Sequence, residues 1–580
     1  MKTFRSTVCA AALFAGGAIA LVPAARAEVP SPSVIARTSP AGNYLAGRHA
    51  TVSRDAEAAV AYYRAALRAD PKNEELLERT FLTMLASGAI EEAAPLAERL
   101  IVIEKSHRMA RLTLAARAIK RNQYVSARSH LSQSVRGPIA DLTATLVGAW
   151  AQYGANDSKG AIEAIDKLQG PDWYATFKDL HAGLMLDAAG QRREAGLRLQ
   201  KAYRGDANSL RTMEAYARWA SRAGDRDTAL KTFAEFGRVL PRHPIVEAAV
   251  AEIKAGRPLT PLLRTPSAGA AEVLYGLGSA LGRQGGEDLG LVYLQLALFL
   301  EPQHPIALIA LADLYESLKK PEQAIEVYSR VPANSPLKRN AEIHRSLNLD
   351  ALDRTDEARK NLEALVAAKP DELEAITALG NLLRARKFYK ESAEIYSRAV
   401  DKIGTPDRGH WALFYFRGIS FERSKQWPLA EQDFELALKL FPDQPQVLNY
   451  LGYSWVDQGL NLDKAVDMIR KAVALRPNDG YIVDSLGWAY YRLGRYEDAV
   501  RELERAIELK PEDPVINDHL GDAYWKVGRR VESFFQWSHA KGLKPEPEDL
   551  EKIQAKLKDG LKDSEPPQKA GAVETKGNGG

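Results

Sequence analysis

A repeat of about 34 residues is the feature that most constrains what this chain can fold into. The pair Leu486-Gly487 returns 34 positions later as Leu520-Gly521. Self-similarity at a fixed period of roughly 20 to 50 residues is typical of solenoids, in which each repeat contacts only its neighbours. The sequence therefore predicts an array that grows in one dimension. Eight blocks share this register and begin at Ala271, Pro305, Arg339, Leu373, Trp411, Pro445, Gly480 and Pro514.

Small residues and prolines recur at fixed places in these blocks. When one inserted residue is allowed in the block at Pro445, the eighth and twentieth positions are Gly, Ala or Ser in all eight blocks, and position 32 is proline in seven of them, against about 5% in average proteins. Positions 4, 7, 8 and 11 share one helical face, as do positions 20, 24 and 27. Small side chains there let two antiparallel helices approach closely, and the proline ends the second helix. The pattern predicts an all-α fold of stacked helix pairs.

The block YIVDSLGWAYYRLGRYEDAVRELERAIELKPEDP, residues 481–514, represents the set. Its period and residue types resemble the tetratricopeptide repeat (TPR) family. The resemblance implies a solenoid of helix–turn–helix units wound into a right-handed superhelix. The N-terminal half holds a weaker copy of the pattern, with blocks near Pro40, Glu74, Arg108, Asp141, Thr176 and Leu210.

The first 27 residues have the features of an export signal. Lys2 and Arg5 precede an apolar run over residues 8–22, and Ala25-Arg26-Ala27 follows it as an A-x-A cleavage site. The run is short for the ~20 residues that a membrane-spanning helix needs. We therefore predict cleavage before Glu28 and a periplasmic protein, while an association with the outer membrane stays open.

Cysteine and charge exclude several classes of site. Cys9 is the only cysteine and lies inside the apolar run, not at its end, so we expect neither lipidation nor disulfides nor a cysteine nucleophile. The chain carries 79 basic and 75 acidic residues, a net charge of +4, which falls close to zero when Lys2, Arg5 and Arg26 are removed. Such a balance argues against nucleic-acid binding. No later stretch is apolar enough to predict an integral membrane span.

The repeat pattern and its interruptions define the predicted domains. An apolar spacing at Leu550, Ile553, Leu557 and Leu561 predicts a capping helix after the last repeat. The predicted order is a signal peptide (1–27), a linker (28–39), a degenerate TPR array (40–243), a Pro-rich joint (244–270), an array of eight repeats (271–547), the capping helix (548–563) and a disordered tail (564–580).

Searches for catalytic motifs find none. The sequence contains no H-E-x-x-H, no G-x-S-x-G and no Walker G-x-x-x-x-G-K-[ST], and its ten histidines include no i, i+4 pair. The Gly-rich stretch 282–290 follows a helix and reads as a turn. We therefore predict no enzymatic activity, no cofactor and no metal site. An enzyme would need a fold hidden in residues 108–270, where the repeat pattern is weakest.

Positions 2, 5, 9, 12 and 13 of each first helix should line a concave groove, with position 6 adjacent to them. In the last four blocks these positions are rich in aromatic residues with charged neighbours, the composition of protein-binding surfaces. The alternative is that individual rings pack against the next repeat. The predicted partner-binding residues are Tyr415, Phe416, Arg423, Tyr450, Tyr453, Tyr481, Asp484, Trp488, Tyr491, Arg492, Asp518, Asp522, Trp525 and Lys526.

Residues 411–547 also resemble the C-terminal repeats of exported TPR proteins of Gram-negative bacteria. Some of these are outer-membrane lipoproteins that bind a periplasmic carboxyl-terminal processing protease and present peptidoglycan hydrolases to it. The resemblance implies a non-catalytic scaffold that binds proteins or peptides and works as such an adaptor, although this chain lacks the lipidation cysteine. A second hypothesis is an assembly scaffold for an envelope or exopolysaccharide export machine. The sequence predicts neither the partner's identity nor an oligomeric state.

Overall fold

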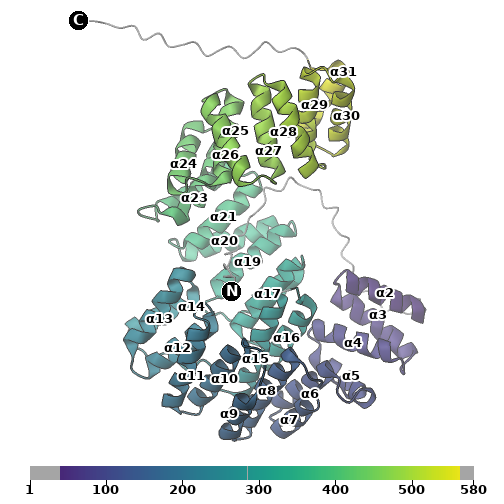
Figure 1. Ribbon diagram of the computed structural model, residues 1–580, viewed down its shortest axis with the longest axis vertical. Helices are drawn as coiled ribbons and strands as arrows, with labels where there is room; N and C mark the ends of the chain where they lie inside the picture. Colours follow the sequence, from purple (N-terminus) through teal and green to yellow (C-terminus); the bar gives the residue numbers. More distant parts are fainter. Residues whose placement is uncertain (1–38, 284, 562–580) are drawn as a thin grey trace. The chain divides into compact units, whose positions relative to one another are not determined.

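The computed structural model describes residues 39–283 and 285–561, and these residues are almost entirely helical (Figure 1). They form the α-helices α2–α31 and one short 3₁₀ helix, and no strand occurs among them. The prediction of an all-α repeat fold is therefore confirmed. The predicted signal peptide, nearly all of the linker and the predicted tail lie outside the described residues.

The chain divides into two compact units between Asn361 and Leu362, inside α20 (Thr355–Ala368). The first unit consists of helix pairs that begin within three residues of the predicted starts near Pro40, Glu74, Arg108, Asp141, Thr176 and Leu210. Its helices are α2 (Pro40–Val52), α3 (Ala56–Ala69), α4 (Glu74–Ala86), α5 (Ile90–Ile103), α6 (Arg108–Lys120), α7 (Tyr124–Ser132), α8 (Pro138–Gly154), α9 (Ser158–Lys167), α10 (Tyr174–Ala188), α11 (Arg192–Gly205), α12 (Leu210–Arg222), α13 (Arg226–Val239), α14 (Pro244–Lys254), α15 (Pro266–Gly282), α16 (Glu287–Leu300), α17 (Pro305–Ser317), α18 (Pro321–Ser329) and α19 (Lys338–Ala351).

In the second unit the first helix of every repeat begins at the residue that the sequence register predicts. The capping helix begins at Pro547, one residue before the predicted start. The elements are α21 (Leu373–Ala385), α22 (Tyr389–Val400), the 3₁₀ helix η1 (Arg408–His410), α23 (Trp411–Arg423), α24 (Trp427–Leu440), α25 (Pro445–Gln458), α26 (Leu462–Leu475), α27 (Gly480–Arg492), α28 (Tyr496–Leu509), α29 (Pro514–Lys526), α30 (Arg530–Gly542) and α31 (Pro547–Asp559).

Glycine at the eighth position lets the two helices of a repeat pack closely. A Cβ atom on Gly487 of α27 would lie 2.5 Å from Cγ of Leu503 and 3.2 Å from its backbone nitrogen on α28. Gly418 stands in the same relation to Phe434 of α24. Because these distances are shorter than any ordinary carbon–carbon contact, a larger side chain would force the two helices apart. The small residues therefore have the packing role that the repeat pattern predicts.

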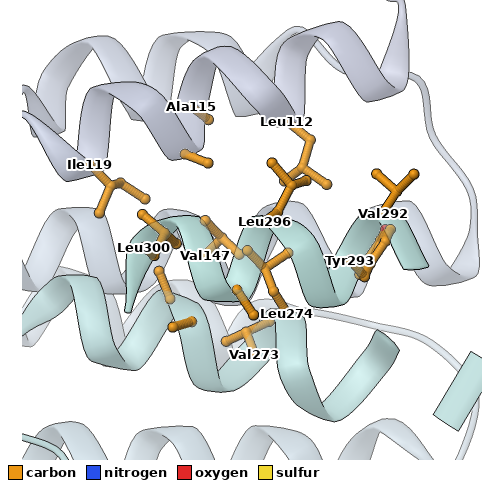
Figure 2. Packing of buried hydrophobic residues seen from close by; sticks show 14 of the residues in the cluster. Leu112, Ala115, Ile119, Val147, Val273, Leu274, Val292, Tyr293, Leu296 and Leu300 are labelled. Carbon is orange, nitrogen blue, oxygen red and sulfur yellow. The ribbon is translucent and has the colours of Figure 1, made fainter. Parts of the chain in front are cut away.

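Helices α15 and α16 depart from the one-dimensional array. They contact each other and also the first helices of earlier repeats: α15 contacts α6, α8 and α10, and α16 contacts α4 and α6. Figure 2 shows the apolar core that results, with Leu112, Ala115 and Ile119 of α6 and Val147 of α8 against Val273, Leu274, Val292, Tyr293, Leu296 and Leu300 of α15 and α16. The first unit is thus held together by contacts between residues far apart in the sequence.

The predicted joint at 244–270 is not a boundary between compact units. It lies inside the first unit, where α14 is a single helix and the following segment leads into α15, which begins five residues before the predicted block start at Ala271. The physical reason is the apolarity of α16. This helix buries ten of its fourteen residues, and a helix that is apolar on all sides has to be surrounded by other helices.

A buried ionic network ties α12 to α15. The guanidinium of Arg211 donates to Glu214 at 2.7 Å and, through Nε, to Oε1 of Glu272 at 2.7 Å, while Nε2 of His304 lies 3.1 Å from the second oxygen of Glu272. Burial opposes ionisation of Glu272, but the charge of Arg211 outweighs it and holds the pKa of that carboxyl below its usual range. The two helices are therefore joined by charges that compensate each other away from water.

We expect Gly487→Leu to lower the free energy of unfolding of the second unit by about 1 to 3 kcal/mol, because the added side chain meets Leu503. The matched control is Gly542→Leu, since a Cβ atom on Gly542 of α30 would meet no atom within 4 Å. Urea denaturation followed by circular dichroism measures both changes. Equal losses in the two variants would contradict the packing role of the eighth position.

Arg211→Met should destabilise the first unit by about 3 to 5 kcal/mol, because it leaves Glu272 buried without its main compensating charge. Arg257→Met is the control, since Arg257 forms an exposed pair with Glu252 and such pairs contribute about 0 to 1 kcal/mol. Hydrogen exchange of α12 and α15 in increasing urea reports on this unit. A small effect of Arg211→Met would show that the network is dispensable.

Candidate functional site

The predicted groove residues lie on α23, α25, α27 and α29, the first helices of the last four repeats. We call the surface built by these four helices the first-helix face. Helix α27 contacts both α25 and α29, and Tyr415 of α23 contacts Tyr450 of α25. Residues that are about 35 positions apart in sequence therefore become neighbours. The predicted groove residues form three groups between α23 and α29.

The first group consists of rings that pack between repeats. Tyr415 and Tyr450 meet edge to face at 5.9 Å, and the guanidinium of Arg384 lies 4.5 Å above the ring of Phe416. The hydroxyl of Tyr450 donates to Glu422 at 3.0 Å. Burial raises the pKa of both tyrosines well above the usual range. For these rings the structure supplies the packing role that was the alternative to partner binding.

The second group is a stack centred on Trp488 of α27. Its indole lies 4.8 Å from the ring of Tyr491, at 9° between planes, and 4.1 Å from the ring of His519 on α29, at 16°. The Nδ1 atom of His519 lies 2.9 Å from Oδ1 of Asp484, which is buried. The stack of Trp488 on His519 and the pair of His519 with Asp484 together join α27 and α29, the first helices of two successive repeats.

His519 lies in a ring of acidic groups. Burial lowers its pKa, but Asp484 of α27 and Asp518 and Asp522 of its own helix outweigh burial, so that the pKa is raised above its ordinary value. Lys556 of α31 is a cation that faces two of these carboxylates, Asp518 and Asp522. The imidazole is therefore protonated to a higher pH than a free histidine would be.

The third group is closed by the capping helix. The Nζ atom of Lys556 lies 2.7 Å from Asp518 and 2.8 Å from Asp522, and Asp522 also accepts from Nε1 of Trp537 at 2.9 Å. Trp525 lies 5.4 Å from Trp537, with the guanidinium of Arg530 3.6 Å above it. Trp525 and Asp522 are thus accounted for by contacts at the end of the array, whereas Asp518 is paired through one of its two oxygens.

Sequence reasoning missed Lys556, His519 and Trp537. A signal for Lys556 was present, because it occupies the ninth position of the register that would begin one repeat after Pro514. The ninth position of the preceding repeat is Asp522, which Lys556 contacts. Continuing the register into the capping helix would have placed a cation beside the acidic residues.

Part of the first-helix face keeps unused binding capacity. Tyr481 is 45% exposed, and no hydrogen bond or ring contact involves the half-buried Tyr453 in the described part of the chain. The buried atoms Nε1 of Trp488, Oδ1 of Asp518 and Oδ1 of Asn449 have no hydrogen-bond partner. Arg492 pairs with Asp457 at 3.2 Å, Arg423 lies 3.6 Å from Glu422, and Lys526 is the last residue of α29. The face therefore presents aromatic surface, and one donor and two acceptors lie buried beside it without partners.

The first unit holds a cavity of about 630 Å³ between α12, α14, residues 258–265 and the start of α17. Arg211, Glu214 and His304 line it, but their charges already pair within the buried network. Among the residues that the structure describes, no three His, Cys, Asp or Glu side chains gather as a metal site would require. Over the same residues, no helix combines the length and apolarity that crossing a bilayer demands.

Comparison with known proteins identifies the repeat. Models described as tetratricopeptide repeats match residues 275–338, 345–407 and 53–73, and a model described as a TPR repeat matches residues 487–528. The chain contains tetratricopeptide repeats. A TPR repeat-containing protein of Pseudomonas aeruginosa is 28% identical over 200 residues, which are 33% of this chain and 32% of that protein. The match thus spans about a third of the relative's length.

Three solved structures are similar to the chain. The hetero-tetramer Cut9–Hcn1 of APC/C aligns over 92% of this chain and 98% of its own, at 12% identity and a TM-score of 0.38. A tetratricopeptide repeat protein from Parabacteroides merdae covers 50% of this chain and 97% of its own, at 13% identity and a TM-score of 0.34. MamA AMB-1 covers 29% and 96%, at 20% identity and a TM-score of 0.25.

TPR units bind other proteins through the surfaces that stacked helices create. The repeats in this chain therefore indicate a protein–protein interaction scaffold. A fold of this kind is generally non-catalytic, and the described residues contain nothing that indicates catalytic activity.

The stability of the C-terminal repeats should fall as pH rises from about 5 to 8. The raised pKa of His519 contributes stability that is fully present below its unfolded pKa of about 6.5 and is lost as pH rises through the folded pKa. Burial raises the pKa of Asp522 to about 6, so its ionisation opposes folding over the lower part of this range. Both groups therefore act in the same direction.

His519→Asn should flatten that pH dependence, measured as the melting temperature of the second unit at intervals from pH 5 to 8. His539→Asn, at an exposed histidine of α30, is the control and should leave the slope unchanged. A wild-type melting temperature that rises with pH across this window would contradict the assignment.

Proposed function

We propose that this protein is a non-catalytic periplasmic scaffold that holds envelope proteins on its first-helix face. In the adaptor role that the resemblance of residues 411–547 implies, it would present peptidoglycan hydrolases to a carboxyl-terminal processing protease. The export-like segment 1–27, which lies outside the described residues, supports the location. The TPR repeats support the scaffold role.

The observation that carries the proposal is the unused capacity of the first-helix face around Trp488. Nε1 of this residue is buried without an acceptor, and Oδ1 of Asp518 lacks a donor. Tyr453 is half-buried; burial raises its pKa, and the nearby charge of Asp484 raises that pKa further. Leaving a buried polar atom unpaired costs about 1 to 3 kcal/mol. A bound polypeptide carries a donor and an acceptor at every residue, and by shifting the Trp488 side chain it could pair with these atoms while it covers the aromatic rings.

Affinity capture from a periplasmic extract tests the proposal. The bait is the chain from Glu28 onward, compared with a Tyr453→Ala/Trp488→Ala variant, and captured proteins are identified by mass spectrometry. We expect the wild-type chain to recover a processing protease or a peptidoglycan hydrolase. The variant should recover at least tenfold less of the same protein. Trp525 is left unchanged because it packs against Phe534 and Arg530 of α30, so its replacement would also affect folding.

Phe535→Ala is the matched control, because Phe535 is an exposed aromatic residue (67%) of the same unit on a second helix, α30. It should capture as the wild type does. Melting temperatures distinguish lost binding from lost folding, since Trp488 also stacks on His519. Recovery of outer-membrane export components would instead favour the assembly scaffold, and equal capture by all baits would place the binding surface elsewhere.

A further inference from the structure

Helix α31, the last helix of the described residues, places a lysine beside two aspartates of the first-helix face. Lys556 is near the C-terminal end of α31 and is only 15% exposed. Its Nζ atom reaches Asp518 at 2.7 Å and Asp522 at 2.8 Å, both on α29. The predicted groove is therefore filled at this point by a side chain of the protein itself.

This acidic site requires a cation. Asp522 is 4% exposed, and burial raises the pKa of its carboxyl to about 6 even with Lys556 beside it. Without a cation, two neighbouring carboxylates would repel each other in surroundings of low polarity. Any helix that takes the place of α31 must therefore bring a positive charge to the same point.

Apolar contacts define the rest of the site. Ile553 of α31 packs with Trp537 and Ala540 of α30, and Leu557 and Leu561 pack against the same small cluster together with Trp525. Ile553, Lys556 and Leu557 therefore follow the spacing i, i+3 and i+4, which is the stripe of one helical face, and Leu561 lies just beyond the end of the helix. Lys552 lies outside this stripe and pairs only with Asp549 of its own helix.

Helix α31 is held by few contacts. Among its thirteen residues only Ile553 is fully buried, whereas α29 buries eight of its thirteen. Its packing partner is α30, and Lys556 supplies the polar contacts with α29. Its departure would expose one buried aliphatic side chain, and it would leave Asp518 and Asp522 without their cation unless the incoming helix brings its own.

We propose that α31 occupies a recognition site for lysine-bearing amphipathic helices and that a partner helix displaces it. The site consists of Asp518, Asp522, Trp525 and Trp537. Its ligand carries apolar residues at i and i+4 and a lysine at i+3, in the pattern of Ile553, Lys556 and Leu557. This rests on the proposed function, because it names the kind of segment that the first-helix face accepts at its C-terminal end.

A peptide of α31 added in trans provides the test. The probe is a fluorescein-labelled peptide of residues 546–561, titrated by fluorescence anisotropy into the full chain and into its Ile553→Asp variant, which weakens the internal helix. We expect Ile553→Asp to bind the probe at least tenfold more tightly than the wild type. Adding Asp522→Asn should remove that binding while keeping an acceptor for Trp537, and a Lys556→Ala probe should not bind.

Lys552→Ala in the full chain is the matched control and should behave as the wild type. If Ile553→Asp fails to fold, Lys556→Ala in the full chain is the second variant that should release α31 from the site. Hydrogen exchange of the unmodified chain adds an independent measurement, in which α31 should exchange at least tenfold faster than α29.

Three results would overturn the proposal. The first is equal probe binding by wild type and both releasing variants, and the second is equal binding of the Lys556→Ala probe. The third is a wild-type dimer that forms with increasing protein concentration and is lost in Lys556→Ala, since a second copy of this chain would then occupy the site. Partner capture that depends on Trp488, together with a negative peptide result, would refute this inference alone and leave the proposed function standing.

Discussion

The close approach of the two helices within each repeat is the constraint on which the rest of this structure depends. Where the eighth residue is glycine, as at Gly418 and Gly487, the facing side chain of the second helix occupies the space that a Cβ atom would need. A fixed distance within each pair lets successive pairs stack in one register. That register in turn places residues one repeat apart in contact, and the stack of Trp488 on His519 is one result.

The local part of the fold could be predicted from the sequence, and the long-range part could not. The repeat period, the small residues and the prolines reflect contacts within a repeat and between neighbouring repeats. The predicted helix starts therefore agree with the observed ones to within a few residues over most of the chain. The packing of α15 and α16 against α6 and α8 joins residues more than 100 positions apart, and no periodic pattern encodes such a contact. The apolar sequence of α16, with ten buried residues, was the available signal.

The candidate site shows the same division. Its aromatic and acidic residues follow from the register, because position in a repeat determines the helical face. Their roles depend on neighbours outside the regular pattern: Lys556 comes from the capping helix and Arg384 from α21. As a result, Tyr415 and Trp525 are accounted for by packing, whereas Trp488 and Asp518 retain buried polar atoms without partners. Contacts, rather than residue type, separate these two classes.

The two units therefore differ in what their first helices can bind. In the first unit, α15 and α16 cover the first helices α4, α6, α8 and α10 with a continuous apolar core, and the buried pair of Arg211 and Glu272 secures α12 to α15. Displacing these helices would expose that core and unpair those charges, which makes the association permanent. Among the described residues of the second unit, α31, with Leu561 just beyond its end, covers part of α29 and α30, and it does so through one fully buried side chain, two half-buried leucines and one lysine. Reversible binding is therefore possible where the internal helix is held weakly, which is at the C-terminal end of the array.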